Sequence, residues 1–177
     1  MLTFLASIYL LINFDYSEPN FQFVFNSGEF INHADAYINL SFGVDGISIL
    51  FVLLTTFLMP LCLVVSVGAI TSNVKTYAIC FLMMESFLLL TFTSLDIICF
   101  YIFFEAVLIP MFILVSAYGS RERRVRAAYL LFMYTLIGSI LMLFGILYIV
   151  YTVGSSDIVV LRNIVPFIFS ESTQKLL

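Results

Sequence analysis

Long runs without a charged residue are the main pattern of the chain. The run from Ile47 to Ile70 holds none over 24 residues, and the run from Ala127 to Val153 holds none over 27. About 20 helical residues cross the roughly 30 Å hydrocarbon layer of a bilayer. These runs therefore predict membrane-spanning helices at about residues 45–70 and 124–153.

The apolar segment between these two runs is too long for one span. Tyr77 to Tyr118 contains 42 residues, which would make about 63 Å of helix at 1.5 Å per residue. The segment must therefore turn back, and the polar residues Ser94 and Asp96 offer the only plausible corner. Either side chain can cap the helix that follows by accepting hydrogen bonds from its first N–H groups. We expect spans at about residues 76–94 and 96–117.

Residues 43–153 thus contain four predicted transmembrane helices. The segments before and after them have other patterns. Residues 1–14, MLTFLASIYLLINF, predict a first short transmembrane helix, either a short span or a docked half-span. Residues 15–42 form an outer loop, in which three alternating phenylalanines precede Asn26-Ser27-Gly28, a pattern typical of a β-hairpin. Residues 154–177, interrupted by Arg162 and Pro166, predict a tail at the membrane interface.

Composition agrees with an integral membrane protein of the all-α class, with about five transmembrane helices. The chain has 177 residues, of which 63% are hydrophobic and 10% charged, and its mean hydropathy is +1.15. Five of its seven Lys and Arg residues fall in two loops that alternation places on one face: Lys75, Arg121, Arg123, Arg124 and Arg126. The positive-inside rule assigns this face to the cytoplasm or the mitochondrial matrix. We expect no nucleic-acid partner.

Two carboxylates fall near the middle of predicted spans, at Glu85 and Glu105. A carboxylate at the centre of a span costs about 2.5–3.5 kcal/mol on insertion scales, so the default hypothesis is a functional site. The alternative is a neutral carboxyl that only hydrogen-bonds a neighbouring helix. Pro110 favours function for Glu105, because proline has no N–H for the Ala106 carbonyl and kinks the helix. Such a kink can hold water for proton transfer.

Glu105 has no basic partner within the predicted spans. Every Lys and Arg lies in a loop, in the tail or at the end of a span. Either the acid stays protonated, or another chain supplies the cation. The cysteines Cys62, Cys80 and Cys99 have no metal-ligand spacing, and no glycine pattern for nucleotide binding is present, so we expect no metal or cofactor on this chain.

Several motifs together resemble the chain 4 family of NADH:ubiquinone oxidoreductase, respiratory complex I. They are Val44-Asp45-Gly46-Ile47-Ser48, Phe103-Phe104-Glu105 with Leu108-Ile109-Pro110, and Gly119-Ser120-Arg121. The resemblance covers roughly residues 39–157. It implies part of an Mrp-type, antiporter-like helix bundle in a multi-pass protein of the mitochondrial inner membrane.

The resemblance also implies a role for Glu105. This residue matches the family's glutamate of a proton-translocating half-channel, which pairs with a lysine two helices later. Glu85 matches no equally firm family position and remains a second candidate. The chain stops where the lysine-bearing helix would begin, so a split subunit is expected, with a complementary C-terminal fragment that carries the intramembrane lysines.

The other expected partners are further membrane subunits of complex I and lipids. The chain would then be a non-redox membrane subunit of an H⁺-translocating NADH:ubiquinone reductase. NADH, FMN, iron–sulfur clusters and ubiquinone would be bound in the rest of the complex. Two alternatives remain: a structural membrane scaffold without its own proton path, and a subunit of a cation/proton antiporter outside respiration.

Overall fold

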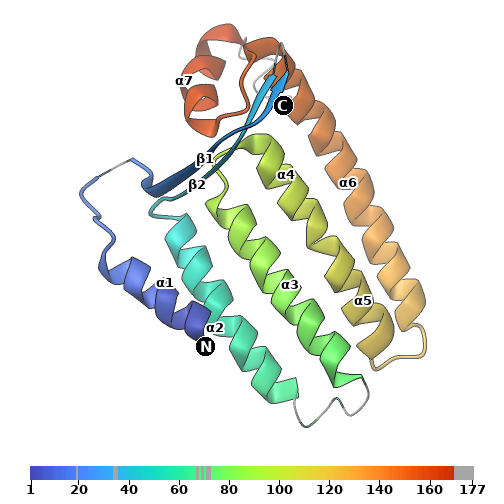
Figure 1. Ribbon diagram of the computed structural model, residues 1–177. Coiled ribbons are helices and arrows are strands. Elements are labelled where there is room, and N and C mark those ends of the chain that lie inside the picture. Colours follow the sequence, from blue (N-terminus) through green and yellow to red (C-terminus); the bar gives the residue numbers. More distant parts are fainter. Residues whose placement is uncertain (19, 34–35, 67, 69, 71–72, 170–177) are drawn as a thin grey trace.

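The structure is a row of membrane-length helices. The computed structural model describes residues 1–18, 20–33, 36–66, 68, 70 and 73–169, with the backbone alone for residues 27–33 and 36–39. The helices are α2 (Ser48–Ser66), α3 (Val74–Thr93), α4 (Ile97–Ala106) with α5 (Leu108–Tyr118), and α6 (Arg124–Val153). All are long and apolar enough to cross a membrane, α4 and α5 together forming one 22-residue span. They lie side by side (Figure 1).

The ends of these helices lie close to the expected ones, and the largest difference is at α2, which ends at Ser66 rather than at residue 70. Of the two residues that could cap the helix after the corner, Ser94 and Asp96, the structure uses Asp96 as the N-cap of α4. Its carboxylate accepts hydrogen bonds from the backbone N–H groups of Ile98, at 2.9 Å, and Cys99, at 3.1 Å. These bonds satisfy N–H groups that have no partner inside the helix.

Helix α1 (Leu2–Ile12) has 11 residues and is therefore about 16 Å long, half the hydrocarbon thickness. It packs against α2 and α3. The Ser7 hydroxyl hydrogen-bonds that of Thr56 on α2 at 2.8 Å, and the Thr3 hydroxyl donates to Glu85 on α3 at 2.7 Å. With α1 added to the four longer spans, the mostly helical fold agrees with about five membrane helices.

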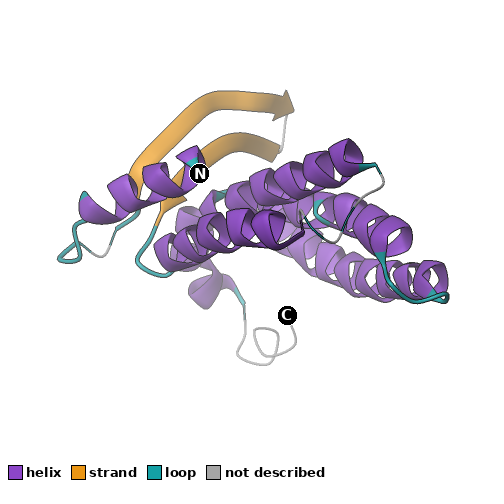
Figure 2. Cartoon of the chain, turned by 90° about the horizontal axis from the view of Figure 1, so that it is seen from below, coloured by secondary structure: helices purple, strands orange, loops and turns teal. Residues whose placement is uncertain are grey.

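The outer loop forms an antiparallel hairpin of β1 (Gln22–His33) and β2 (Ala36–Val44). The structure thus contains the hairpin that the sequence predicts in this loop, with Asn26-Ser27-Gly28 inside β1. The strand pairing shifts register between Asn26 and Glu29, so the segment is accommodated as an irregularity of the strand. The hairpin lies to one side of the helices (Figure 2), and β2 contacts α3 and α4.

A final short helix, α7 (Ile158–Ile168), follows α6. The Asp157 carboxylate caps it by accepting a hydrogen bond from the Val159 N–H at 2.7 Å. Pro166 lies in its last turn rather than interrupting it. Residues 170–177 of the expected tail lie outside the described residues.

The two basic loops lie at the same end of the bundle, as the charge pattern predicts. The Tyr118 hydroxyl at the end of α5 donates to the Asn73 carbonyl before α3, at 2.8 Å. The rings of Tyr77 and Tyr118 also pack edge to face, with centroids 5.1 Å apart. These contacts join the α2–α3 connection to the start of the α5–α6 loop.

Candidate functional site

Glu105 lies near the end of α4, beside the break between α4 and α5. Its side chain is half-buried, and its Oε1 atom is buried without a hydrogen-bond partner among the described residues. The carboxylate lines a hollow of about 380 Å³ between the α4–α5 span and α6. The other lining residues are all apolar: Ile102, Ala106, Ile109, Phe132 and Leu136.

The break in the span lies at Val107, one turn before Pro110. Proline cannot donate to the Ala106 carbonyl, so the helical ladder loses one bond immediately after Glu105. On either side of this gap, Val107 donates to the Phe103 carbonyl and Met111 donates to the Val107 carbonyl, each at 3.3 Å. The Pro110 side chain is fully buried. Val107 itself keeps right-handed helical dihedral angles (φ −60°, ψ −31°), so the kink at Pro110 stays a prediction.

Two polar side chains near Glu105 are absent from the sequence prediction. Tyr101 lies one helical turn before it on α4, and its hydroxyl interacts electrostatically with Glu105 and with Ser139 on α6. Ser139 is buried, and its hydroxyl donates to the Leu136 carbonyl at 2.9 Å. The spacing of Tyr101 and Glu105, four residues apart on one helix, is the signal that could have identified the first of them.

Glu85 occupies a different environment. It is 6% exposed in α3 and accepts the hydrogen bond from Thr3 of α1. The structure does not bring Glu85 and Glu105 into one site, because the first faces α1 and the second faces the hollow beside α6. The Oε1 atom of Glu85 thus accepts a hydrogen bond from a hydroxyl group, whereas the Oε1 atom of Glu105 has no partner among the described residues.

No basic side chain of the described spans lies near the depth of Glu105. The basic residues that belong to spans are Lys75, Arg124 and Arg126, and they occupy the first turns of α3 and α6. Both turns lie at the end of the bundle marked by Tyr118, whereas Glu105 is more than three turns away from Tyr118 along the α4–α5 span. A buried carboxylate without a cation is costly when ionised.

Comparison with known proteins gives consistent similarities. A family model described as the amino terminus of NADH-ubiquinone oxidoreductase chain 4 matches residues 1–95, and one described as the transmembrane region of NADH:quinone oxidoreductase/Mrp antiporter proteins matches residues 94–177. NADH-ubiquinone oxidoreductase chain 4 of Marchantia polymorpha is 45% identical over 177 residues, which are 100% of this chain and 34% of the relative.

Other relatives show the same partial coverage. The protein of the same name from Arabidopsis thaliana is 46% identical over 161 residues, 91% of this chain and 32% of the relative. A chain in the structure of respiratory complex I from Thermus thermophilus with bound NADH is 30% identical with a TM-score of 0.74, covering 92% of this chain and 32% of that one. The chain thus spans about a third of the length of the curated relatives it matches.

Proposed function

Because the chain belongs to the NADH-ubiquinone oxidoreductase chain 4 family, we propose that it forms the amino-terminal part of a proton-translocating membrane subunit of respiratory complex I. It is a multi-pass protein of the mitochondrial inner membrane. In this proposal its role is proton translocation coupled to NADH:ubiquinone electron transfer. NADH, FMN, iron–sulfur clusters and ubiquinone are bound by other subunits.

The observation that carries the proposal is the unpartnered oxygen of Glu105 in an otherwise apolar hollow. A nearby positive charge stabilises an ionised carboxylate in an apolar environment, and removal of that charge favours the protonated form. A basic side chain that approaches Glu105 in its charged form and then leaves would therefore make Glu105 release and take up a proton. We propose that this base is an intramembrane lysine outside these 177 residues, in the remaining part of the subunit.

Pro110 and Tyr101 would support this step. The Ala106 carbonyl, to which Pro110 cannot donate, and the Tyr101 hydroxyl place polar atoms near the carboxylate, where a water molecule needs partners inside a membrane. Glu85 remains a second candidate for proton transfer. Its hydrogen bond with Thr3 supports equally well a structural role in holding α1.

The second candidate function is a subunit of a cation/proton antiporter, since one matching family model also describes Mrp antiporter proteins. Purification of the native assembly through an affinity tag on this chain separates the two functions. The proposal predicts co-purification of flavin, iron–sulfur clusters and NADH:quinone activity in constant ratio to the chain. An assembly that exchanges cations for protons but lacks these groups would favour the antiporter.

A further inference from the structure

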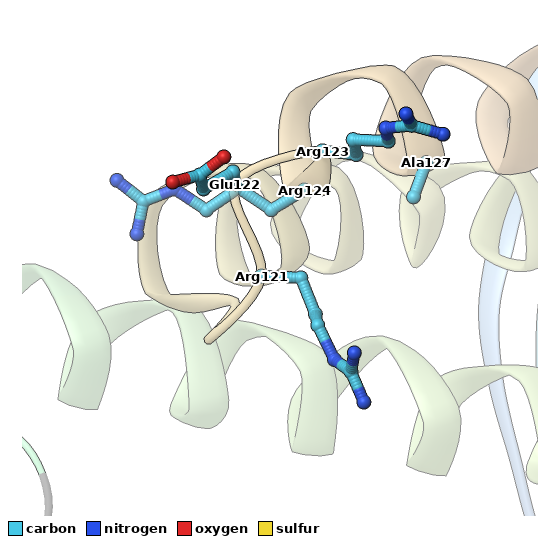
Figure 3. Close-up of a pocket in the computed structure, with 5 residues that line it drawn as sticks. All are labelled: Arg121, Glu122, Arg123, Arg124 and Ala127. Carbon is cyan, nitrogen blue, oxygen red and sulfur yellow. The ribbon is translucent and has the colours of Figure 1, made fainter.

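The loop between α5 and α6 forms an open hollow, lined by exposed side chains, that the proton-transfer proposal does not use. The hollow has a volume of about 550 Å³ and is lined by Arg121, Glu122, Arg123, Arg124 and Ala127 (Figure 3). Three of its five lining residues are arginines, and one is acidic. The hollow therefore offers a surplus of positive charge to whatever occupies it.

Local packing holds this loop in shape. The Arg124 guanidinium donates a hydrogen bond to the Gly119 carbonyl at 3.0 Å. A Cβ atom at Gly119 would lie 2.6 Å from the Val115 carbonyl oxygen and 2.9 Å from Cβ of Arg124. Only glycine allows the chain to approach so closely at this point. The loop thus closes tightly at the end of α5, where it begins.

The hollow lies at the ends of two membrane-length segments. It follows Tyr118, the last residue of α5, and ends in the first turn of α6, and both helices belong to membrane spans. Tyr77 and Tyr118 pack together at this end of the bundle, and tyrosines gather at membrane–water interfaces. Basic pockets between transmembrane helices on the matrix or cytoplasmic side suit anionic lipid headgroups.

We propose that this hollow is a binding site for the phosphate-bearing headgroup of an anionic phospholipid. Guanidinium groups pair with phosphate through paired N–H donors. Figure 3 shows the side chains of Arg121, Arg123 and Arg124 extending in three different directions from the loop. This spread suits a lipid with two phosphates, or adjacent headgroups, better than one free phosphate ion. The proposal is independent of proton transfer at Glu105.

The chain contains no tryptophan, so Ala127→Trp introduces a single fluorescent reporter into the lining. The full chain with this change is reconstituted into phosphatidylcholine nanodiscs that contain a small fraction of brominated cardiolipin or brominated phosphatidylcholine. Quenching by each brominated lipid gives their relative affinity for the hollow. We expect at least a fivefold preference for cardiolipin, since each basic residue near a surface contributes about a factor of five in affinity.

Matched variants distinguish binding of the lipid in the hollow from a general attraction of anionic lipids to the basic loop. Arg121→Gln with Arg123→Gln should reduce the preference to about the phosphatidylcholine level, whereas Arg126→Gln, which removes a neighbouring charge outside the lining, should retain most of it. Equal quenching by both lipids with the native arginines present would overturn the proposal, whether or not the variants fold. The proposal would also be overturned if Arg126→Gln reduced the preference for cardiolipin as much as the double variant does. Displacement of the brominated cardiolipin by millimolar inorganic phosphate would assign the hollow to free phosphate and overturn the lipid assignment.

Discussion

Asp96 and Ser156, which are 60 residues apart in the sequence, are joined by a buried hydrogen bond from the Ser156 hydroxyl to the Asp96 carboxylate. The backbone around them pairs as well: Ile97 donates to the Ser156 carbonyl at 3.0 Å, and Ile158 donates to the Leu95 carbonyl at 2.9 Å. Leu95 in turn donates to the Ser41 carbonyl of β2 at 2.9 Å. Asp96 thus caps α4 and ties the connection between α6 and α7 to the bundle.

This double role predicts that Asp96→Ala is strongly destabilising. The variant loses both the helix cap and the bond from Ser156, so we expect the free energy of unfolding to fall by about 2–4 kcal/mol. Ser156→Ala removes one bond alone and should cost about 1–2 kcal/mol. Thermal unfolding of the detergent-solubilised chain, followed by circular dichroism, measures both. Equal and small losses in the two variants would refute the capping role of Asp96.

The contact between Thr3 and Glu85 predicts how α1 is held. Thr3→Val removes the hydroxyl that donates to a buried carboxyl oxygen, and a buried acceptor without a partner costs about 1–3 kcal/mol. We expect faster amide hydrogen exchange in α1 of this variant. Thr3→Ser retains the hydroxyl and is the matched control. Exchange that stays unchanged in Thr3→Val would mean that the other contacts of α1, the Ser7–Thr56 hydrogen bond and the packing of Phe4 on Phe57, hold it without Thr3.

The outer loop contains a turn that depends on pH. Hydrogen bonds from the Ser17 hydroxyl and then the Ser17 N–H lower the pKa of Asp15 below its ordinary value of 3.8. A lowered folded-state pKa means that this stabilisation is complete above the ordinary value and is lost as the pH falls through the folded-state value. We expect Ser17→Ala to raise the pKa of Asp15 toward 3.8. Carboxyl-carbon NMR titration measures this change, and an unaltered titration would contradict the assigned cause.

The helices were predictable from the sequence because the bilayer leaves the backbone few choices. Uninterrupted apolar length locates α2 and α6, and Asp96 marks the corner between α3 and α4 by the chemistry of its side chain. Pro110 removes the hydrogen bond to the Ala106 carbonyl, and the boundary between α4 and α5 lies next to that carbonyl, at Val107. Asn26-Ser27-Gly28 has turn chemistry but lies in a strand, because a register shift accommodates it.

The polar contacts between distant segments were not predictable. The partners Thr3 and Glu85, and likewise Asp96 and Ser156, are separated by 82 and 60 residues. Sequence pattern describes one element at a time and does not tell which polar atoms of packed elements will meet. For the same reason the sequence located Glu105 on its helix but did not identify Ser139 beside Tyr101.

The central claim is that Glu105 exchanges protons during turnover, and the ratio of protons translocated to NADH oxidised tests it most directly. The measurement uses the complete complex in sealed vesicles, with Glu105→Gln compared against Glu18→Gln, the same change at an exposed residue of the outer loop. The account predicts an assembled complex with a clearly lower ratio for Glu105→Gln and an unchanged ratio for Glu18→Gln. An unchanged ratio in an assembled Glu105→Gln complex would contradict it.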